Sequence, residues 1–360
     1  MSGCNGEREA DFLVFRQNTH SKTAANLLYC HQFHCEEVES MNQTEKTTFP
    51  VYYRVFPASL SEKGTLEEVA ARAGALAWLG VDGVVLAPDG QAWTAEEKTT
   101  LREALSAVGL TLREETVLSQ SMEQLHHRCR RPNWEAVPYD PGEAKDLILQ
   151  NQAEEAPALY FENENLPRSV SEMGDDGWYR RESASLLAAV LLTLRGTVVL
   201  YQGQELGMVN PSFPLEELVR SEAADWLATP DAQRRSQEEL EAKIGRFTCL
   251  NARTVPDFDN PDARETVEWY HKLLTLRKTT KALQMGAFTP LLPEHRRALL
   301  YTRTWEDQQI LVIANLSGYA AEYPSHLERG TLLLHNYQEQ GNFPGILRPF
   351  EVKIYHQNLR

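Results

Sequence analysis

From about residue 49 the chain alternates between short apolar runs and longer segments whose apolar residues recur at helical spacing. The run Val51–Phe56 is rich in β-branched and aromatic residues, which favours a buried strand. The next segment has one apolar helical face, made by Leu66, Val69, Ala73 and Leu76. Gly80 then stands where the C-terminus of a helix favours a left-handed residue, and Val81–Leu86 predicts a second strand.

The same pattern repeats, and each of these two predicted helices has a start signal. Thr65 with Glu68, and Thr94 with Glu97, match the capping box, in which the two side chains bond backbone N–H groups of the first turn. After the second helix, Leu110–Leu118 predicts a third strand. This order of strands and helices indicates a parallel sheet with helices outside it.

The pattern resumes after a polar break at residues 119–133. Asp140 precedes Pro141, a residue that suits the first position of a helix, so a further helix is expected to begin there. The strongly apolar segment Glu182–Arg195 predicts a buried helix. The other elements predicted for this part are strands at Ala158–Phe161 and Thr197–Tyr201 and helices near Gln237–Ile244 and Ala263–Lys278.

From about Gly286 short alternating runs separated by turn residues replace the helical segments. The runs are Ala298–Arg303, Gln309–Ala314, Thr331–Leu334 and Phe350–Tyr355. They predict a small antiparallel β domain. We therefore expect an α/β domain over residues 49–284 and a C-terminal β-sandwich-like domain over 285–360. Residues 1–48 are polar apart from one apolar run, Phe12–Phe15, and form an appendage for which no structure is predicted.

Composition narrows the classes of partner. The 360 residues carry a formal net charge of −15, which disfavours polyanions, and no basic stripe points to nucleic acid. No apolar stretch is long enough to cross a membrane, and the polar, acidic start does not suit a secretory signal, so a cytoplasmic protein is expected. Five scattered cysteines argue against a disulfide framework, and no cofactor is expected.

One short segment of the appendage holds candidate metal ligands. On a helix, Cys30 with His34, or His31 with Cys35, would be four residues apart and could share a metal. Further ligands could come from His126, His127 and Cys129. The spacing matches no standard zinc pattern, so ordinary polar residues are the favoured interpretation and a metal-binding module is the alternative.

Several segments in order resemble known motifs. Asn163–Ser171, followed by Gly174-Asp175-Asp176, looks like an Asn-His-Asp motif with its trailing Pro-Arg. Three more segments have counterparts in the same family, namely Val51–Pro57, Leu79–Pro88 and Tyr201–Met208, and Asn251–Thr254 resembles a motif of one branch. Together, over residues 49–356, they resemble the α-amylase family, glycoside hydrolase family 13, and within it the oligo-1,6-glucosidase and trehalose-6-phosphate hydrolase branch. The resemblance implies a (β/α)₈ barrel, a C-terminal β domain and glycoside hydrolysis.

The catalytic parts of that family have no counterpart here. Its nucleophile is an Asp in a Gly-Phe-Arg-x-Asp context and its acid is a Glu after a Gly, and neither context occurs in the corresponding region. Only residues 121–133, 13 in number, separate Gln120 at the end of the third strand from Trp134 on the approach to the seventh. Strands four to six do not fit there, so we expect an incomplete barrel whose edges are open or are covered by a homodimer or another partner.

The remaining motif positions are altered. The resemblance places substrate contacts at Tyr53, Gln120, Asn163, Asn165 and Arg168, although a structural salt bridge is favoured for Arg168. In the Asn-His-Asp motif Glu164 replaces His and Asn165 replaces Asp, so the negative charge of the Asp is lost. A retaining glycosidase needs two carboxyl groups about 5–5.5 Å apart.

Two interpretations of the remaining carboxylates stay open. The candidates Glu115, Glu164 and Glu205 either form a rebuilt catalytic pair or are ordinary hydrogen-bonded loop carboxylates. Four aromatic residues could stack on sugar rings or simply pack, namely Trp93, Trp134, Trp178 and Tyr179. We expect a protein that has lost hydrolysis and acts in carbohydrate binding, as a scaffold or in regulation, with an α-glucoside or oligosaccharide as its ligand. The alternative is an active α-glucosidase-type hydrolase with a rebuilt site.

Overall fold

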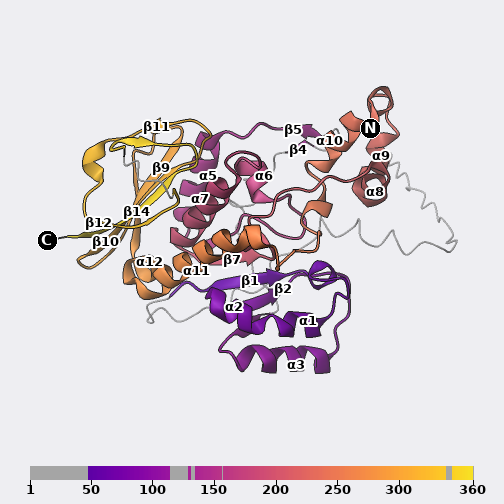
Figure 1. Ribbon diagram of the computed structural model, residues 1–360, viewed down its shortest axis with the longest axis horizontal. Coiled ribbons are helices and arrows are strands. Elements are labelled where there is room, and N and C mark those ends of the chain that lie inside the picture. The colour runs from indigo at the N-terminus through magenta and orange to yellow at the C-terminus, as the bar shows by residue number, and fades with distance from the viewer. Residues whose placement is uncertain (1–47, 114–128, 131–133, 156, 338–342, 360) are drawn as a thin grey trace, which may run out of the picture. The chain divides into compact units, whose positions relative to one another are not determined.

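The centre of the fold is a parallel sheet of five strands. The computed structural model describes residues 48–113, 129–130, 134–155, 157–337 and 343–359. The strands are β1 (Val51–Val55), β2 (Gly83–Leu86), β3 (Thr111–Arg113), β6 (Ala158–Leu159) and β7 (Thr197–Tyr201), in the order β3-β2-β1-β7-β6. Every pair is parallel, which confirms the predicted α/β class. Figure 1 labels β1, β2 and β7 at the centre of the fold.

Among the described residues the sheet has two edge strands and does not close, as expected for an incomplete barrel. Its edge strands are β3 and β6, and β4 (Cys129–Arg130) pairs only with β5 (Glu135–Ala136), in a separate antiparallel ladder. No strand among the described residues therefore joins the two edges. The edge of β6 is partly sealed, because Asn151 Nδ2 donates a hydrogen bond to the carbonyl oxygen of Ala158 at 3.3 Å. In β3, Thr111 and Arg113 are exposed and Leu112 is half-buried.

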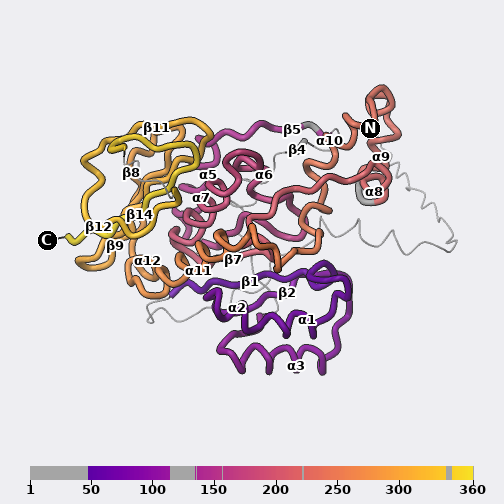
Figure 2. Tube along the Cα trace, viewed as in Figure 1, coloured from indigo at the N-terminus to yellow at the C-terminus, as the bar shows by residue number. Residues whose placement is uncertain are grey.

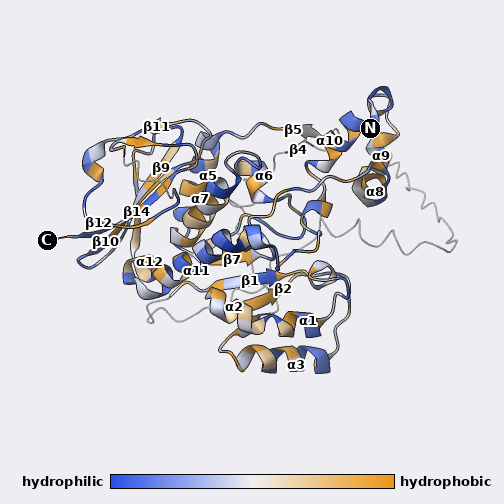
Figure 3. Ribbon diagram, viewed as in Figure 1, coloured by the Kyte–Doolittle hydropathy of each residue, from blue (hydrophilic) through white to orange (hydrophobic). Residues whose placement is uncertain are grey.

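Helices follow the strands and pack against the sheet. They are α1 (Leu66–Ala71), α2 (Ala73–Leu79), α3 (Ala95–Ser106), α5 (Pro141–Gln152), α6 (Ser169–Met173), α7 (Arg180–Thr193), α11 (Arg264–Thr279) and α12 (Lys281–Met285). The chain path in Figure 2 places α1 to α3 beside β1 and β2, and α11 contacts both α2 and α7. Helix α7 is buried almost throughout because it also contacts β10 and β14 of the C-terminal sheet, and Figure 3 shows its apolar character.

The predicted helix boundaries are confirmed at most positions. The capping box of Thr94 and Glu97 is formed, and Gly80 adopts a φ of 108° at the end of α2. The capping box at Thr65 was wrong, because the Thr65 side chain makes no cap bond. The carboxylate of Glu68 instead accepts a hydrogen bond from the Ser61 hydroxyl, a competitor in the preceding loop.

A separate helical cluster follows β7. It contains α8 (Leu215–Leu218), a π-helical turn (Val219–Ala223), α9 (Ala224–Leu227) and α10 (Gln237–Gly245). Its small core includes Trp226, Ile244 and Phe247, and Trp134 is buried with them. Packing, one of the two roles open for Trp134, is therefore the one that the structure shows.

The C-terminal sheet is antiparallel, as predicted. Its strands are β8 (Ala287–Leu291), β9 (Ala298–Trp305), β10 (Gln308–Asn315), β12 (Thr331–His335) and β14 (Val352–Asn358), in the order β12-β14-β10-β9-β8. A second ladder joins β11 (Ala321–Glu322) to β13 (Ile346–Leu347). Alternate residues of β9 and β10 face two cores, so Tyr301 and Val312 join the core of the parallel sheet while Leu300 and Ile313 join a core shared with β11 and β13.

Two buried arginines fix the C-terminal sheet and α11 to the end of α7. Arg303 donates to the carbonyl oxygen of Thr193 at 2.8 Å, and Arg277 donates to those of Leu192 and Leu194 at 2.7 and 2.9 Å. Burial lowers the pKa of Arg277 to about 10 and that of Arg303 to about 9, so both stay charged at neutral pH. Cations at the C-terminus of a helix also interact favourably with its dipole.

Some predicted features lie outside the described residues. They include the appendage up to residue 47, with its run Phe12–Phe15 and the candidate ligands Cys30, His31, His34 and Cys35. In the part of the chain that the structure describes, no helix is both long and apolar enough to cross a membrane.

The carboxylate of Glu351 in the C-terminal sheet gives a test of pH dependence. Burial alone would raise its pKa, but hydrogen bonds from His335 and from the side chain and backbone of Arg348 outweigh burial and lower the pKa to about 2. A lowered pKa stabilises the fold above the unfolded value of 4.5, and this contribution is lost as pH falls from 4.5 towards about 2.

We therefore expect Glu351→Gln to destabilise the protein at pH 7, with the difference from wild type shrinking below about pH 4.5. Urea unfolding of both proteins across this pH range measures the difference. The matched control is Glu322→Gln at the exposed position of β11, which should differ little from wild type at any pH. A difference for Glu351→Gln that is independent of pH would contradict this assignment.

Candidate functional site

Polar residues collect where β1, β6 and β7 end. Enzymes built on parallel barrels work at the carboxyl ends of the strands, so this is the face to examine. Arg54 lies in β1, Glu162 and Glu164 follow β6, and Gln202 and Glu205 follow β7. Parallel strands bring all five to the same end of the sheet.

At the centre of this face is the ion pair between Arg168 and Glu162. Arg168 Nη1 lies 2.9 Å from Glu162 Oε2, and the two side chains are 0% and 1% exposed. The same guanidinium donates to the carbonyl oxygens of Gln202 and Asn251, and the other carboxylate oxygen accepts from the amide and hydroxyl of Ser169. These bonds hold the ends of β6 and β7 against the segment that follows α10.

Glu164 is held by a second buried pair. Arg54 donates to it through Nε at 2.8 Å and Nη2 at 2.7 Å, one bond to each carboxylate oxygen. The side chains are only 10% and 8% exposed. Such a two-pronged pair is among the strongest charge-assisted contacts, so both oxygens of Glu164 are engaged.

Glu205 is buried in a less polar environment. The Tyr53 hydroxyl donates to Glu205 Oε1 at 2.7 Å and accepts from the Gly203 amide at 3.2 Å. Glu205 Oε2 has no hydrogen-bond partner among the described residues. Burial is the main cause that raises the pKa of the Glu205 carboxyl, and burial likewise raises the pKa of Tyr53.

The exposed rim of this face contains the altered motif. Asn165 is exposed, and its side-chain Oδ1 accepts a hydrogen bond from Arg253 Nη2 at 2.9 Å. Its backbone N–H donates to Asn163 Oδ1 at 2.9 Å. Arg253 Nε also donates to the carbonyl oxygen of Glu164 at 3.1 Å. The amide at position 165 thus takes part in a loop contact with a cation.

The predicted site residues fall into three groups. Tyr53, Glu164, Arg168 and Glu205 come together at the strand ends but are buried, whereas Asn163 and Asn165 reach the surface beside them. Arg168 forms the structural salt bridge that the sequence favours. The remaining candidates, Glu115 and Gln120, lie outside the described residues, as do His126 and His127.

Two functional residues were not predicted from the sequence, Arg54 and Glu162. Both stand among apolar residues that predicted buried strands. Arg54 is the one charged residue within Val51–Phe56, and Glu162 directly follows Phe161. A charged residue in or directly after a buried strand is itself a signal that a partner must exist. Of the aromatic candidates, Trp93 packs partly against the main core and Trp178 is 89% exposed. The ring centroids of Tyr179 and Phe350 lie 6.1 Å apart, so Tyr179 packs against that ring.

The arrangement leaves little chemistry at the strand ends. Glu162 and Glu164 are paired with arginines, and Glu205 is buried against Tyr53. Within the described ranges, no group of three or more His, Cys, Asp or Glu side chains could hold a metal ion. The clustered polar groups bind one another and not an open space.

Comparison with known proteins identifies the family to which this fold belongs. A family model described as "Alpha amylase, catalytic domain" matches residues 113–286. An oligo-1,6-glucosidase of Heyndrickxia coagulans is 31% identical over 257 residues, which are 62% of this chain and 46% of that protein. The trehalose-6-phosphate hydrolase of Escherichia coli strain K12 is 34% identical over 228 residues, 54% of this chain and 41% of that protein. The chain belongs to glycoside hydrolase family 13, the α-amylase family.

Within that family the chain falls in the oligo-1,6-glucosidase-like branch, and it is shortened. It spans less than half the length of the two curated relatives above. A crystal structure of Bacillus licheniformis trehalose-6-phosphate hydrolase superposes with a TM-score of 0.57 at 20% identity, over 83% of this chain and 69% of that one. A mutant of isomaltulose synthase from Erwinia rhapontici gives a TM-score of 0.67 at 16% identity, over 85% and 98%. These two structures show the shared fold.

The pair of Glu162 and Arg168 predicts a large effect of a small change. Glu162→Gln keeps the shape of the side chain but leaves the Arg168 charge unpaired in the interior, so we expect a loss of about 3–5 kcal/mol in the free energy of unfolding. Urea unfolding measures it. The matched control is Glu268→Gln, which breaks the exposed pair with Arg264 and should change stability by about 0.5 kcal/mol or less. Equal effects of the two substitutions would contradict the central role of Arg168.

Glu205 predicts a pH dependence of the opposite sign to that of Glu351. Its raised pKa means that the folded state keeps the proton at pH values where the unfolded chain, with a pKa of 4.5, releases it. The stabilising contribution of Glu205 is therefore greatest below pH 4.5 and is lost as pH rises through the folded pKa. In Glu205→Gln this fall should be absent, which unfolding from pH 4 upwards would show. An unchanged pH slope in the variant would mean that Glu205 is ionised in the fold.

Proposed function

We propose that this chain is a family member that binds α-glucosides or acts as a scaffold, and does not hydrolyse them. The observation that carries the proposal is the two-pronged pair between Arg54 and Glu164, in which both oxygens of a strand-end carboxylate are already bonded. A glycosidase needs one free carboxylate to attack or to activate water and one carboxylic acid to protonate the leaving oxygen. Glu164 is engaged too fully for either task.

The other two described carboxylates at the strand ends support the same proposal. Freeing Glu162 would leave Arg168 buried without its ionic partner, at a cost of several kcal/mol. Glu205 has a raised pKa, as a general acid often has, but it is 5% exposed and bonded to the buried Tyr53. A sugar could reach neither group without opening this part of the fold.

The open sheet is the second line of support. By resemblance to the family, the nucleophile and the acid would follow the fourth and fifth barrel strands. The described strands correspond to the first three and the last two, with edges at β3 and β6. The rival function is hydrolysis through a rebuilt site that includes Glu115, and what favours it is that the relatives above are named as glucosidases and hydrolases.

The proposal predicts no turnover above buffer of 4-nitrophenyl α-glucoside, isomaltose or trehalose 6-phosphate by the full chain. The substitutions Glu115→Gln, Glu164→Gln and Glu205→Gln should change nothing in this assay. Turnover caused by a trace of the expression host's own hydrolase would be the same in all three variants as in wild type, which identifies it as contamination. Turnover that falls at least about 10²-fold in one folded variant would refute the loss of hydrolysis.

A thermal-shift series tests the binding half of the proposal. A ligand that binds only the native state must raise its stability, so maltose, isomaltose or trehalose should raise the unfolding temperature in a concentration-dependent way. Buffer without saccharide gives the reference, and an equal concentration of sorbitol controls for general solute effects. If no saccharide shifts the transition beyond sorbitol, the scaffold role alone remains.

A further inference from the structure

A hollow of about 470 Å³, lined by none of the strand-end residues described above, lies between the start of α5 and the C-terminal sheet. We call this hollow the junction groove. Six of its lining residues carry the argument, namely Asp140, Asp175, Arg296, Arg297, Tyr319 and Phe350. Its volume falls within the range of about 300–1,000 Å³ that is usual for small-molecule sites. A second hollow of about 380 Å³ shares the lining residues Arg296 and Arg297 with it.

The two walls of the junction groove have complementary hydrogen-bonding groups. On the α5 side, Asp140 Oδ1 accepts from the Glu143 amide and Asp175 Oδ1 accepts from the Gly177 and Tyr179 amides. The Oδ2 atoms of both carboxylates have no partner among the described residues, so each can accept from a ligand.

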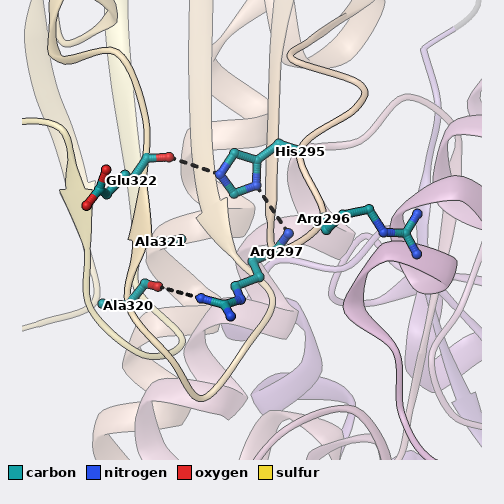
Figure 4. Close-up of a pocket in the computed structure, with 6 residues that line it drawn as sticks. All are labelled: His295, Arg296, Arg297, Ala320, Ala321 and Glu322. Atoms are coloured by element: carbon teal, nitrogen blue, oxygen red, sulfur yellow. Dashed lines mark hydrogen bonds between the residues drawn. The ribbon is translucent and has the colours of Figure 1, made fainter.

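The opposite wall supplies donors. The Arg297 side chain donates one bond, from Nη1 to the carbonyl oxygen of Ala320 at 3.3 Å, and the other N–H groups of its guanidinium have no hydrogen-bond partner in the described part of the chain. Its neighbour Arg296 is already paired across the groove with Asp140 and Asp146. Figure 4 shows the two guanidiniums diverging, with Arg296 extended towards the helix and Arg297 turned towards Ala320. Arg297 is therefore the guanidinium with donors to spare.

Aromatic side chains complete the groove. Tyr319 is 72% exposed, and its ring lies 5.6 Å from the Arg297 guanidinium. Phe350 is buried at the floor, under Gly318. An exposed aromatic ring can pack against the C–H face of a polar ring molecule. The donors and acceptors beside it can then form hydrogen bonds with the hydroxyls of that molecule.

The wall that carries Arg297 is held in place before any ligand arrives. His295 Nδ1 accepts from the amides of Arg297 and Ala298 at 3.1 and 2.9 Å, and Nε2 donates to the carbonyl oxygen of Glu322 at 2.9 Å (Figure 4). The ring thus ties the turn before β9 to β11. A preorganised wall lowers the entropy cost of binding.

The charges of the lining select the class of ligand. Two carboxylates, Asp140 and Asp175, face two guanidiniums, Arg296 and Arg297, so the formal charge of the lining is zero. An anion such as phosphate would meet both carboxylates, and Arg296 is neutralised by two acids. A neutral molecule whose hydroxyls both donate and accept can use every free group on the two walls.

We propose that the junction groove binds a neutral saccharide of one or two pyranose rings, with one ring on Tyr319 and hydroxyls bonded to Arg297, Asp140 and Asp175. The inference rests on the carbohydrate-binding role proposed above and gives that role a site with a lining distinct from the strand-end cluster. It does not depend on the loss of hydrolysis, because turnover and affinity are measured separately.

The test is a titration of the full chain with maltose and with isomaltose, followed by ligand-observed NMR and calorimetry. Tyr319→Ala and Arg297→Ala should each weaken binding about tenfold or more, whereas Tyr319→Phe keeps the ring and should stay close to wild type. Both positions are exposed, so the variants should unfold like wild type.

Two matched controls remove a similar side chain elsewhere. Trp78→Ala deletes another exposed aromatic ring, and Arg264→Ala deletes another exposed guanidinium, and neither lines the groove. Both should leave affinity unchanged. The proposal is overturned if neither saccharide binds, if binding survives Tyr319→Ala and Arg297→Ala together, or if inorganic phosphate binds more tightly and displaces the saccharide.

Discussion

The guanidinium of Arg168 is the group on which the strand-end face depends. A charge with no exposed surface must be compensated entirely by the protein, and Arg168 obtains its compensation from Glu162 and from the carbonyl oxygens of Gln202 and Asn251. Those three partners lie after β6, after β7 and after α10. One side chain therefore sets the positions of three segments that are far apart in the sequence, and the ring of Tyr201 lies beside it at 5.4 Å.

This constraint also explains why the neighbouring carboxylates face inwards. Once Glu162 and the turn after it are fixed, Glu164 lies opposite Arg54 of β1 and forms a pair that is as well bonded as the first. Paired charges in the interior contribute little net stability compared with apolar packing, but removing one partner is costly. Each charge in these two pairs therefore holds its partner in place. Such an arrangement suits a scaffold better than a catalytic site, whose carboxylates must change protonation in each cycle.

The two faces of the five-stranded parallel sheet must be covered by the helices and the C-terminal sheet, because the barrel is incomplete. Helix α7 does much of this, because it contacts α11 and the C-terminal sheet as well as belonging to the main core. Arg277 and Arg303 bond the carbonyl oxygens at its C-terminal end, so the two sheets share a continuous interior. The edge strands differ, since Asn151 bonds the outer side of β6 while Thr111 and Arg113 of β3 stay exposed.

Local pattern alone determined the five parallel strands, the capping box at Thr94, the left-handed Gly80 and the alternation of β9 and β10. These features depend on residues close in sequence, where apolar period and backbone preference act directly. The 13 residues between Gln120 and Trp134, together with the family resemblance, likewise predicted that the middle strands of a barrel do not fit there. Only the tertiary structure decided which charges meet, because Arg54 and Glu164 are 110 residues apart. Desolvation makes each buried charge seek a partner, but which partner lies within reach depends on the packing of the whole sheet.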